Sequence, residues 1–109
     1  TKRDPLEEVI EKINETYKGD FTEADRVLIG TLREKLLADK KLRKAAKVDG
    51  QQIFEKNVFP KIFDQTAQAS YIESTETYTK LFEDTAKYKA VMVALAKELY
   101  RELRNGQEG

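Results

Sequence analysis

Apolar residues recur at spacings of three and four along almost the whole chain, and this periodicity constrains the fold more than any other feature. Two stripes show it well, Leu6, Val9, Ile10, Ile13 and Tyr17 in one and Ala24, Val27, Leu28, Leu32 and Leu36 in the next. The 109 residues include only two prolines and five glycines, too few for an all-β or disordered chain. The sequence therefore predicts an all-α fold, a single bundle of five or six helices over residues 1–109.

Capping residues indicate where these helices begin. An Asp, Ser or Thr side chain that accepts a hydrogen bond from the first turn is the usual N-cap. Such residues precede the apolar stripes at Asp4, Thr22, Asp39, Ser74 or Thr75, and Asp84 or Thr85. Gly19 is suited to the left-handed conformation that ends many helices, and Asp49-Gly50 is typical of a turn.

Pro60 lies inside a long apolar segment. A proline within a helix removes one hydrogen bond and clashes with the preceding turn. We therefore expect either a kink, or a break at Phe59 with Pro60 in the first turn of a new helix. Near the end of the chain, Asn105-Gly106 is a stop signal, so we expect residues 105–109 to form a frayed tail.

The absence of cysteine and histidine excludes several chemistries. Without cysteine there is no disulfide, no thiolate nucleophile and no cysteine-based zinc site. Without histidine the chain lacks the commonest general base near neutral pH. The sequence contains no phosphate-binding loop and no nucleophile elbow. We therefore expect no catalytic residue, no metal site and no cofactor in this chain.

Carboxylates gather near the first helix, at Asp4, Glu7, Glu8, Glu11 and Glu15. Glutamates one turn apart are able to hold a hard cation. Metal sites of the di-iron type in helical bundles, however, also use a Glu-x-x-His motif, which a chain without histidine cannot supply. We interpret these carboxylates as a solvated helix face.

The sequence also bears on where the protein works. No apolar run approaches the roughly 20 residues needed to cross a bilayer, and no secretory signal opens the chain. We therefore expect a cytoplasmic protein that does not enter a membrane. Because the chain starts at Thr1 and its only methionine is Met92, we expect it to be a fragment of a longer protein.

Basic residues concentrate between positions 33 and 47, although twenty Lys and Arg balance twenty Asp and Glu in the whole chain. Six of them are candidate contacts to DNA phosphates: Arg33, Lys40, Lys41, Arg43, Lys44 and Lys47. A basic stripe gives salt-dependent, sequence-independent affinity for DNA, and the lack of interleaved aromatic residues argues against base stacking. The alternatives are a solvated face and a partner surface of complementary charge.

Aromatic residues lead to two predictions. Most of them are expected in the core, namely Phe54, Phe59, Phe63, Phe82, Tyr88 and Tyr100. Phe59, Phe63 and Tyr71 do not all face one interior direction of a regular helix. We therefore predict a partner interface among these three residues, with some of them covered by another domain or subunit.

Several segments resemble one protein family in order and spacing. They are Pro5-Leu6 with Ile10 and Asn14, the turn Gly19-Asp20-Phe21-Thr22-Glu23-Ala24-Asp25, Leu42-Arg43 with Ala45-Ala46, Phe54-x-x-x-Val58-Phe59, and Ala96-Lys97-Glu98-Leu99-Tyr100. Together they resemble the C-terminal helical region of type I restriction enzyme R subunits. The turn from Phe21 to Asp25 is the most specific piece, and the resemblance runs from about Pro5 to Arg104. Pro60 and the segment 74–79 depart from the family pattern.

This resemblance implies a function at the level of an assembly. The R subunit of the family is an ATP- and Mg²⁺-dependent translocase and endonuclease that works with methylation (M) and specificity (S) subunits. None of its catalytic residues has a counterpart here. The resemblance therefore implies a non-catalytic domain that docks the motor subunit onto the M subunit, with duplex DNA nearby. Two alternatives remain open, an electrostatic DNA-binding module that uses residues 33–47 and an unrelated helical domain with a structural role.

Overall fold

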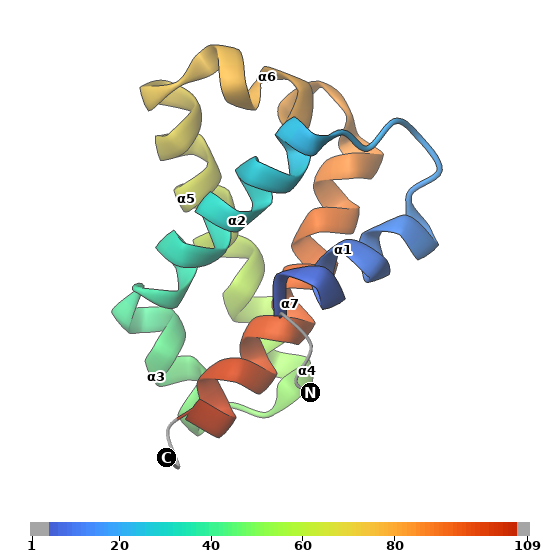
Figure 1. The fold of residues 1–109 in the computed structure, drawn as a ribbon. Helices are drawn as coiled ribbons and strands as arrows, with labels where there is room; N and C mark the ends of the chain where they lie inside the picture. Colours follow the sequence, from blue (N-terminus) through green and yellow to red (C-terminus); the bar gives the residue numbers. More distant parts are fainter. Residues whose placement is uncertain (1–4, 107–109) are drawn as a thin grey trace.

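The computed structural model describes residues 5–106, which are helical apart from short connections. The helices are α1 (Pro5–Thr16), α2 (Glu23–Leu37), α3 (Lys40–Val48), a continuous helix made of α4 (Gln51–Ile53), η1 (Phe54–Val58) and α5 (Phe59–Glu73), then α6 (Thr75–Glu83) and α7 (Thr85–Gly106) (Figure 1). Within residues 5–106 there are six helices and no strand. This architecture confirms the predicted all-α bundle of five or six helices.

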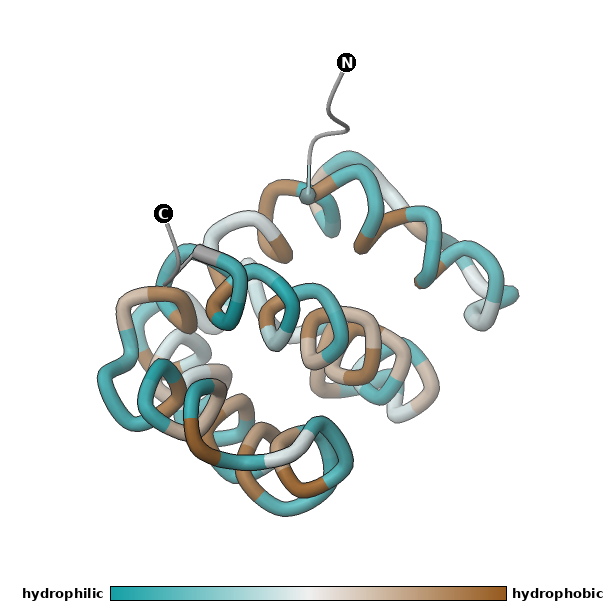
Figure 2. The backbone as a smooth tube through the Cα atoms, turned by 90° about the horizontal axis from the view of Figure 1, so that it is seen from below, coloured by the Kyte–Doolittle hydropathy of each residue, from teal (hydrophilic) through white to brown (hydrophobic). Residues whose placement is uncertain are grey.

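Helix α7 is the central element of the bundle. It has 22 residues and packs against α1, α2, α3, η1, α5 and α6. Figure 1 shows α6 at one end of the bundle and α3 at the other, beside the last turns of α7. Hydrophilic and hydrophobic segments alternate along the helices, as Figure 2 shows, because each helix turns one apolar side inward. The buried side chains form one continuous core.

The capping residues lie where the sequence predicts, within the described part of the chain. Thr22 and Asp25 form a capping box at the start of α2, in which each side chain accepts a hydrogen bond from the other residue's backbone N–H. Asp39 accepts from the Leu42 N–H at the start of α3. Asp84 does the same for the Lys87 N–H in α7. Ser74 stands at the start of α6, but its side chain makes no capping hydrogen bond and donates to the Thr77 hydroxyl instead. The predicted cap at Asp4 lies outside the described residues.

The inward face of α2 differs from the predicted stripe. Val27 is 63% exposed and Ala24 is exposed, whereas Ile29 and Asp25 are buried. The helix is turned so that the Asp25 carboxylate faces the interior, where it pairs with Lys87 of α7. Apolar periodicity alone could not locate this face, because a polar residue occupies one of its positions.

The end of α1 and the end of α7 also differ from the expectations. Gly19 is not left-handed, since no residue of the described chain has a positive φ. A Cβ at Gly19 would collide with the ring of Tyr17, so this position needs a glycine for close approach. Helix α7 includes Asn105 and Gly106, its last described residues, so these two positions of the predicted frayed tail are helical, and the buried Leu103 holds the last turns against the core. The rest of the predicted tail, residues 107–109, lies outside the described part.

Pro60 is accommodated by a π-helical turn. The Phe59 N–H bonds to the Phe54 carbonyl five residues earlier, and α5 then starts with Pro60 in its first turn. The wider π turn takes up the proline, which has no N–H to donate and clashes with a regular preceding turn. Pro60 thus stands in the first turn of a new α-helical segment, as one of the two predicted alternatives had it, but without a break in the helix.

The π turn also explains where the aromatic residues lie. In a regular α-helix, five residues of separation would turn Phe59 about 140° away from Phe54. The wider turn brings both rings to the same side, with centroids 5.9 Å apart. They belong to a continuous aromatic row formed by Tyr100, Phe54, Phe59, Phe63, Tyr88, Phe82 and Tyr71. Adjacent rings are 5.0 to 5.9 Å apart, the separation of favourable aromatic pairs.

This row corrects the predicted aromatic interface. Phe59 and Phe63 have no exposed surface, so they belong to the core and cannot meet a partner while the fold is intact. The prediction failed for these two residues because they are four positions apart in α5, so one helical turn places both on the core face. Tyr71 lies at the end of the row, half-buried against Phe82. The prediction of six aromatic core residues agrees with the packing.

Candidate interaction surfaces

The outer face of α3 carries a cluster of cations. All five basic residues of this helix are exposed: Lys40, Lys41, Arg43, Lys44 and Lys47. The inner face of the same helix buries small apolar side chains, which fixes the basic side outward. Four of the cations, all but Lys41, line one shallow hollow of about 210 Å³. The structure thus brings together five of the six predicted phosphate contacts, which we call the α3 basic face.

Arg33 does not join them. Its side chain is 12% exposed and points into the bundle, where the guanidinium donates to both carboxylate oxygens of Glu98 at 2.9 and 3.3 Å. Burial would lower the pKa of Arg33, but the hydrogen bond and the charge of Glu98 outweigh this and raise it. The expectation of a phosphate contact at Arg33 is therefore wrong, because this cation joins α2 to α7. In Glu98, the partner of Arg33 in this ion pair, burial raises the pKa of the carboxyl group.

A second buried ion pair joins α2 to α7 at the other end. The Lys87 ammonium donates to Asp25 at 2.9 Å, and both side chains are at most 10% exposed. The Lys87 nitrogen also lies 5.5 Å from the centre of the Tyr17 ring, whose hydroxyl donates to Asp84. Every buried side-chain nitrogen and oxygen of the described residues has a hydrogen-bond partner. This polar cluster therefore ties the 17–22 connection to the starts of α2 and α7.

Proton affinities in this cluster follow from its contacts. Burial acts to raise the pKa of Asp25, but hydrogen bonds from Lys87 and Thr22 outweigh it and hold the pKa below its usual value. The hydrogen bond from Tyr17 lowers the pKa of Asp84. The same bond raises the pKa of Tyr17 to about 12. At neutral pH the two carboxylates are therefore ionised and the phenol is protonated.

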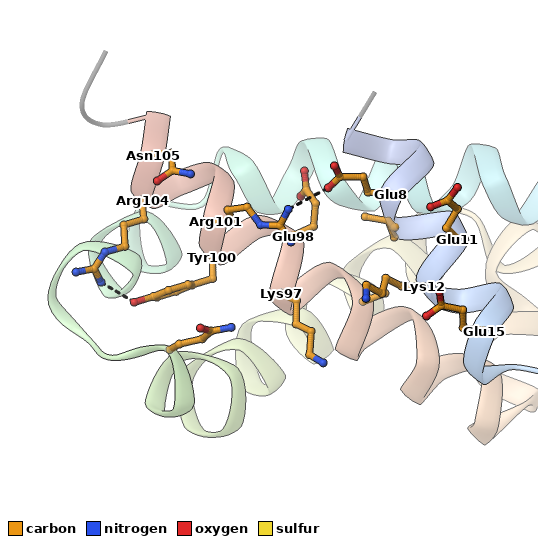
Figure 3. Close-up of a pocket in the computed structure, with 13 residues that line it drawn as sticks. Glu8, Glu11, Lys12, Glu15, Lys97, Glu98, Tyr100, Arg101, Arg104 and Asn105 are labelled. Atoms are coloured by element: carbon orange, nitrogen blue, oxygen red, sulfur yellow. Dashed lines mark hydrogen bonds and ion pairs between the residues drawn. The ribbon is translucent and has the colours of Figure 1, made fainter. Parts of the chain in front are cut away.

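A groove opens between α1 and α7. It has a volume of about 590 Å³, and its walls carry charges of opposite sign. Helix α1 contributes Glu8, Glu11, Lys12 and Glu15, and α7 contributes Lys97, Glu98, Tyr100, Arg101, Arg104 and Asn105 (Figure 3). One ion pair crosses the groove, between Arg101 and Glu8 at 3.3 Å. Arg104 donates to the Tyr100 hydroxyl and lies over its ring, while that hydroxyl donates to the Asp49 carbonyl.

A second hollow of about 460 Å³ lies between η1 and α7. Its α7 side is apolar, formed by Met92, Val93 and Ala96, and Val93 is 40% exposed. Gln51 borders this hollow as well as the charged groove, so the two adjoin. Between them, α7 presents a continuous strip of residues at helical spacing, Val93, Lys97, Tyr100, Arg101 and Arg104. We call this surface the α7 strip.

Sequence reasoning missed the α7 strip. Tyr100 was assigned to the core by periodicity, and the α1 glutamates were interpreted as a solvated face. Tyr100 does pack on Phe54, and its edge borders the groove as well. The available signal was the set of basic residues Lys97, Arg101 and Arg104, spaced by one turn each on the last helix. Nothing in the sequence indicated that α1 would lie opposite them.

Two further findings concern the described residues as a whole. No group of three or more Asp and Glu side chains within residues 5–106 is placed to hold a metal ion. Over the same part of the chain, no helix combines the length and apolar character required to cross a bilayer.

Comparison with family models, curated proteins and solved structures finds no match to this chain.

Proposed function

We propose that this chain is a non-catalytic docking domain, the C-terminal helical domain of a type I restriction enzyme R subunit. In this proposal it binds the M subunit of the methyltransferase core and so holds the ATP- and Mg²⁺-dependent motor on the complex, in the cytoplasm. The family resemblance, centred on the Phe21–Asp25 turn, motivates it. In the structure that turn forms the capping box at the start of α2.

The α7 strip is the observation that carries the proposal. The strip lies on α7, the central helix of the bundle, and two adjoining hollows border it. From Val93 to Arg104 it spans about 16 Å at the rise of an α-helix. A surface with an exposed apolar residue, an aromatic edge and two arginines has the composition of protein interfaces, which are enriched in aromatic residues and arginine.

Calorimetric titration of the chain into a purified M–S core tests the proposal. We expect saturable binding without ATP, with an affinity that falls less steeply between about 50 and 200 mM NaCl than DNA binding does, because apolar and short-range contacts add to the charge pairs at such an interface. A folded chain that fails to bind, tested beside a full R subunit that does bind, would contradict the proposal.

The α3 basic face supports a second candidate function, electrostatic binding of duplex DNA. Four cations around one hollow form a compact positive surface, and a bound duplex would release counterions from its phosphates. The α3 basic face has no exposed aromatic side chain for stacking, so we expect no sequence preference.

Duplex DNA titrated at low and high salt separates this candidate from the first. Affinity should fall steeply between about 50 and 200 mM NaCl, and Lys40→Glu with Lys44→Glu should weaken binding equally for unrelated sequences. Lys61→Glu with Lys89→Glu is a matched control, because both lysines are exposed and lie outside α3. Equal loss of binding in the control would show that net charge matters and the α3 basic face does not.

A further inference from the structure

We propose that the groove between α1 and α7 receives one α-helix of the M subunit, with acidic residues along one edge and basic residues along the other. This inference rests on the proposed function and adds the position and the chemistry of the partner segment. Three features of this region carry it: the opposite charge of the groove's walls, the apolar patch of the adjoining hollow and the helical spacing of the α7 strip.

The two walls select opposite charges in the partner. On the α7 side, Lys97 and Arg104 present cations to the groove, and Arg101 between them pairs with Glu8 across it. The remaining acid on that side, Glu98, is buried in its pair with Arg33. On the α1 side the groove is bordered by three glutamates and Lys12. A helix lying in the groove therefore finds a positive wall on one side and a mainly negative wall on the other, which fixes its direction as well as its position.

Arg104 is positioned in advance for a carboxylate. Its guanidinium lies 5.6 Å from the centre of the Tyr100 ring and donates one hydrogen bond to the hydroxyl of that ring. Tyr100 is itself held by its hydrogen bond to the Asp49 carbonyl and by its contact with the Phe54 ring. A guanidinium has five N–H donors in a rigid fork, so a stacked and oriented Arg104 is able to bind a carboxylate through two bonds at little entropic cost.

The α7 strip has a spacing that fits a helix. Val93, Lys97, Tyr100 and Arg104 are separated by four, three and four residues, the alternating spacing that keeps one side of a helix facing a packed neighbour. At the η1 end, the hollow that adjoins the groove adds an apolar patch of Val93, Met92 and Ala96 for one or two side chains of the partner. An apolar anchor beside charged residues is the usual arrangement where a helix occupies a groove.

Photocrosslinking to the purified M–S core locates the partner segment directly. A benzophenone amino acid at Lys97 should crosslink to the M subunit, and mass spectrometry should place the captured peptide on a helix that has Asp or Glu at the positions nearest the crosslink. The same amino acid at Lys61, exposed on α5 and outside the α7 strip, is the control and should give little crosslinking.

Affinity measurements on groove variants complete the test. Val93→Arg and Lys97→Glu with Arg104→Glu should each weaken binding to the core at least tenfold, while circular dichroism and thermal unfolding stay close to wild type. Val27→Arg, at an exposed valine of α2, is the control for the first change and should bind normally.

The outcomes separate this inference from the proposed function. Wild-type binding that all groove variants retain would overturn the inference and leave the docking function standing. A captured peptide without acidic residues, or one from an unstructured segment, would overturn the chemistry assigned to the groove. A chain that forms a dimer lost in Val93→Arg would show that the occupant is a second copy, and a wild-type chain that does not bind the core would refute both proposals.

Discussion

The structure uses two groups of cations in opposite ways. Arg33 and Lys87 point into the bundle and pair with Glu98 and Asp25, at distances of 2.9 Å. The cations of α3 point outward and line a shallow hollow. The first group therefore connects helices, while the second leaves its charge available at the surface.

The difference shows that the role of a charged side chain depends on whether it is buried and on which side chain it pairs with. Arg33 pairs with a residue 65 positions away in the chain, and Lys87 with one 62 positions away. A buried charge without its partner is strongly unfavourable, whereas an exposed one costs almost nothing to replace. Substitutions in the interior should therefore lower stability, and substitutions on the α3 basic face or the α7 strip should change binding.

The largest effect is expected at the aromatic row. Phe59→Ala should lower the free energy of unfolding by about 3 to 5 kcal/mol, because it removes a fully buried ring that contacts two others. Chemical denaturation measures the change. Tyr71→Ala, at the half-buried end of the row, should cost less than half as much. A loss at Phe59 below about 1 kcal/mol would mean that Phe59 is not a core residue.

Breaking the interior ion pair should have the next largest effect. Lys87→Met removes the partner of a buried carboxylate and should cost about 3 kcal/mol in urea unfolding. Lys89→Met is the matched control, since Lys89 is exposed two residues away, and it should change stability by less than about 0.5 kcal/mol. Equal effects of the two changes would contradict a structural role for Lys87.

Acid should weaken the same polar cluster. The pKa values of Asp25 and Asp84 lie below the ordinary 3.8, so their contribution to stability is complete above that pH and is lost as pH falls through the lowered values. Glu98 works in the opposite direction, because burial raises its pKa and the folded state binds that proton more tightly. Unfolding curves measured from pH 7 down to pH 2 should show a loss below about pH 4. The loss should be smaller in Asp25→Asn, and an unchanged acid profile in that variant would contradict the assignment.

The smallest stability effect is expected on the outer surface. Neutralising Lys40 and Lys44 with glutamine should change the free energy of unfolding by less than about 0.5 kcal/mol, because both side chains are exposed. Thermal unfolding measures this directly. A loss comparable to that of Lys87→Met would show that these lysines support the fold.

Local signals in the sequence were enough to predict much of the fold. The caps at Thr22, Asp39 and Asp84 follow from short-range chemistry. The inward face of α2 and the packing of Phe54 on Phe59 did not follow. The first depends on a polar contact between distant residues, and the second on a π turn that changes the helical phase before Pro60.

The candidate sites were predictable only in part for the same reason. The α3 basic face was visible because its cations lie within eight residues of each other on one helix. The groove beside α7 was not, since it forms where the first and last helices meet. Arg33 shows the opposite error. It lies near the cations of α3 in the sequence, but it points into the bundle and is not part of the α3 basic face.

The central claim is that interior residues determine stability and surface residues determine binding. The most direct test measures the free energy of unfolding and the affinity for the M–S core on Lys87→Met and Val93→Arg side by side. We predict that Lys87→Met loses about 3 kcal/mol of stability but binds the core normally at a temperature where it is folded. Val93→Arg should keep its stability and lose at least tenfold in affinity. If instead both variants lost stability and affinity in proportion, the fold and the binding surface would not be separable, and the account would be contradicted.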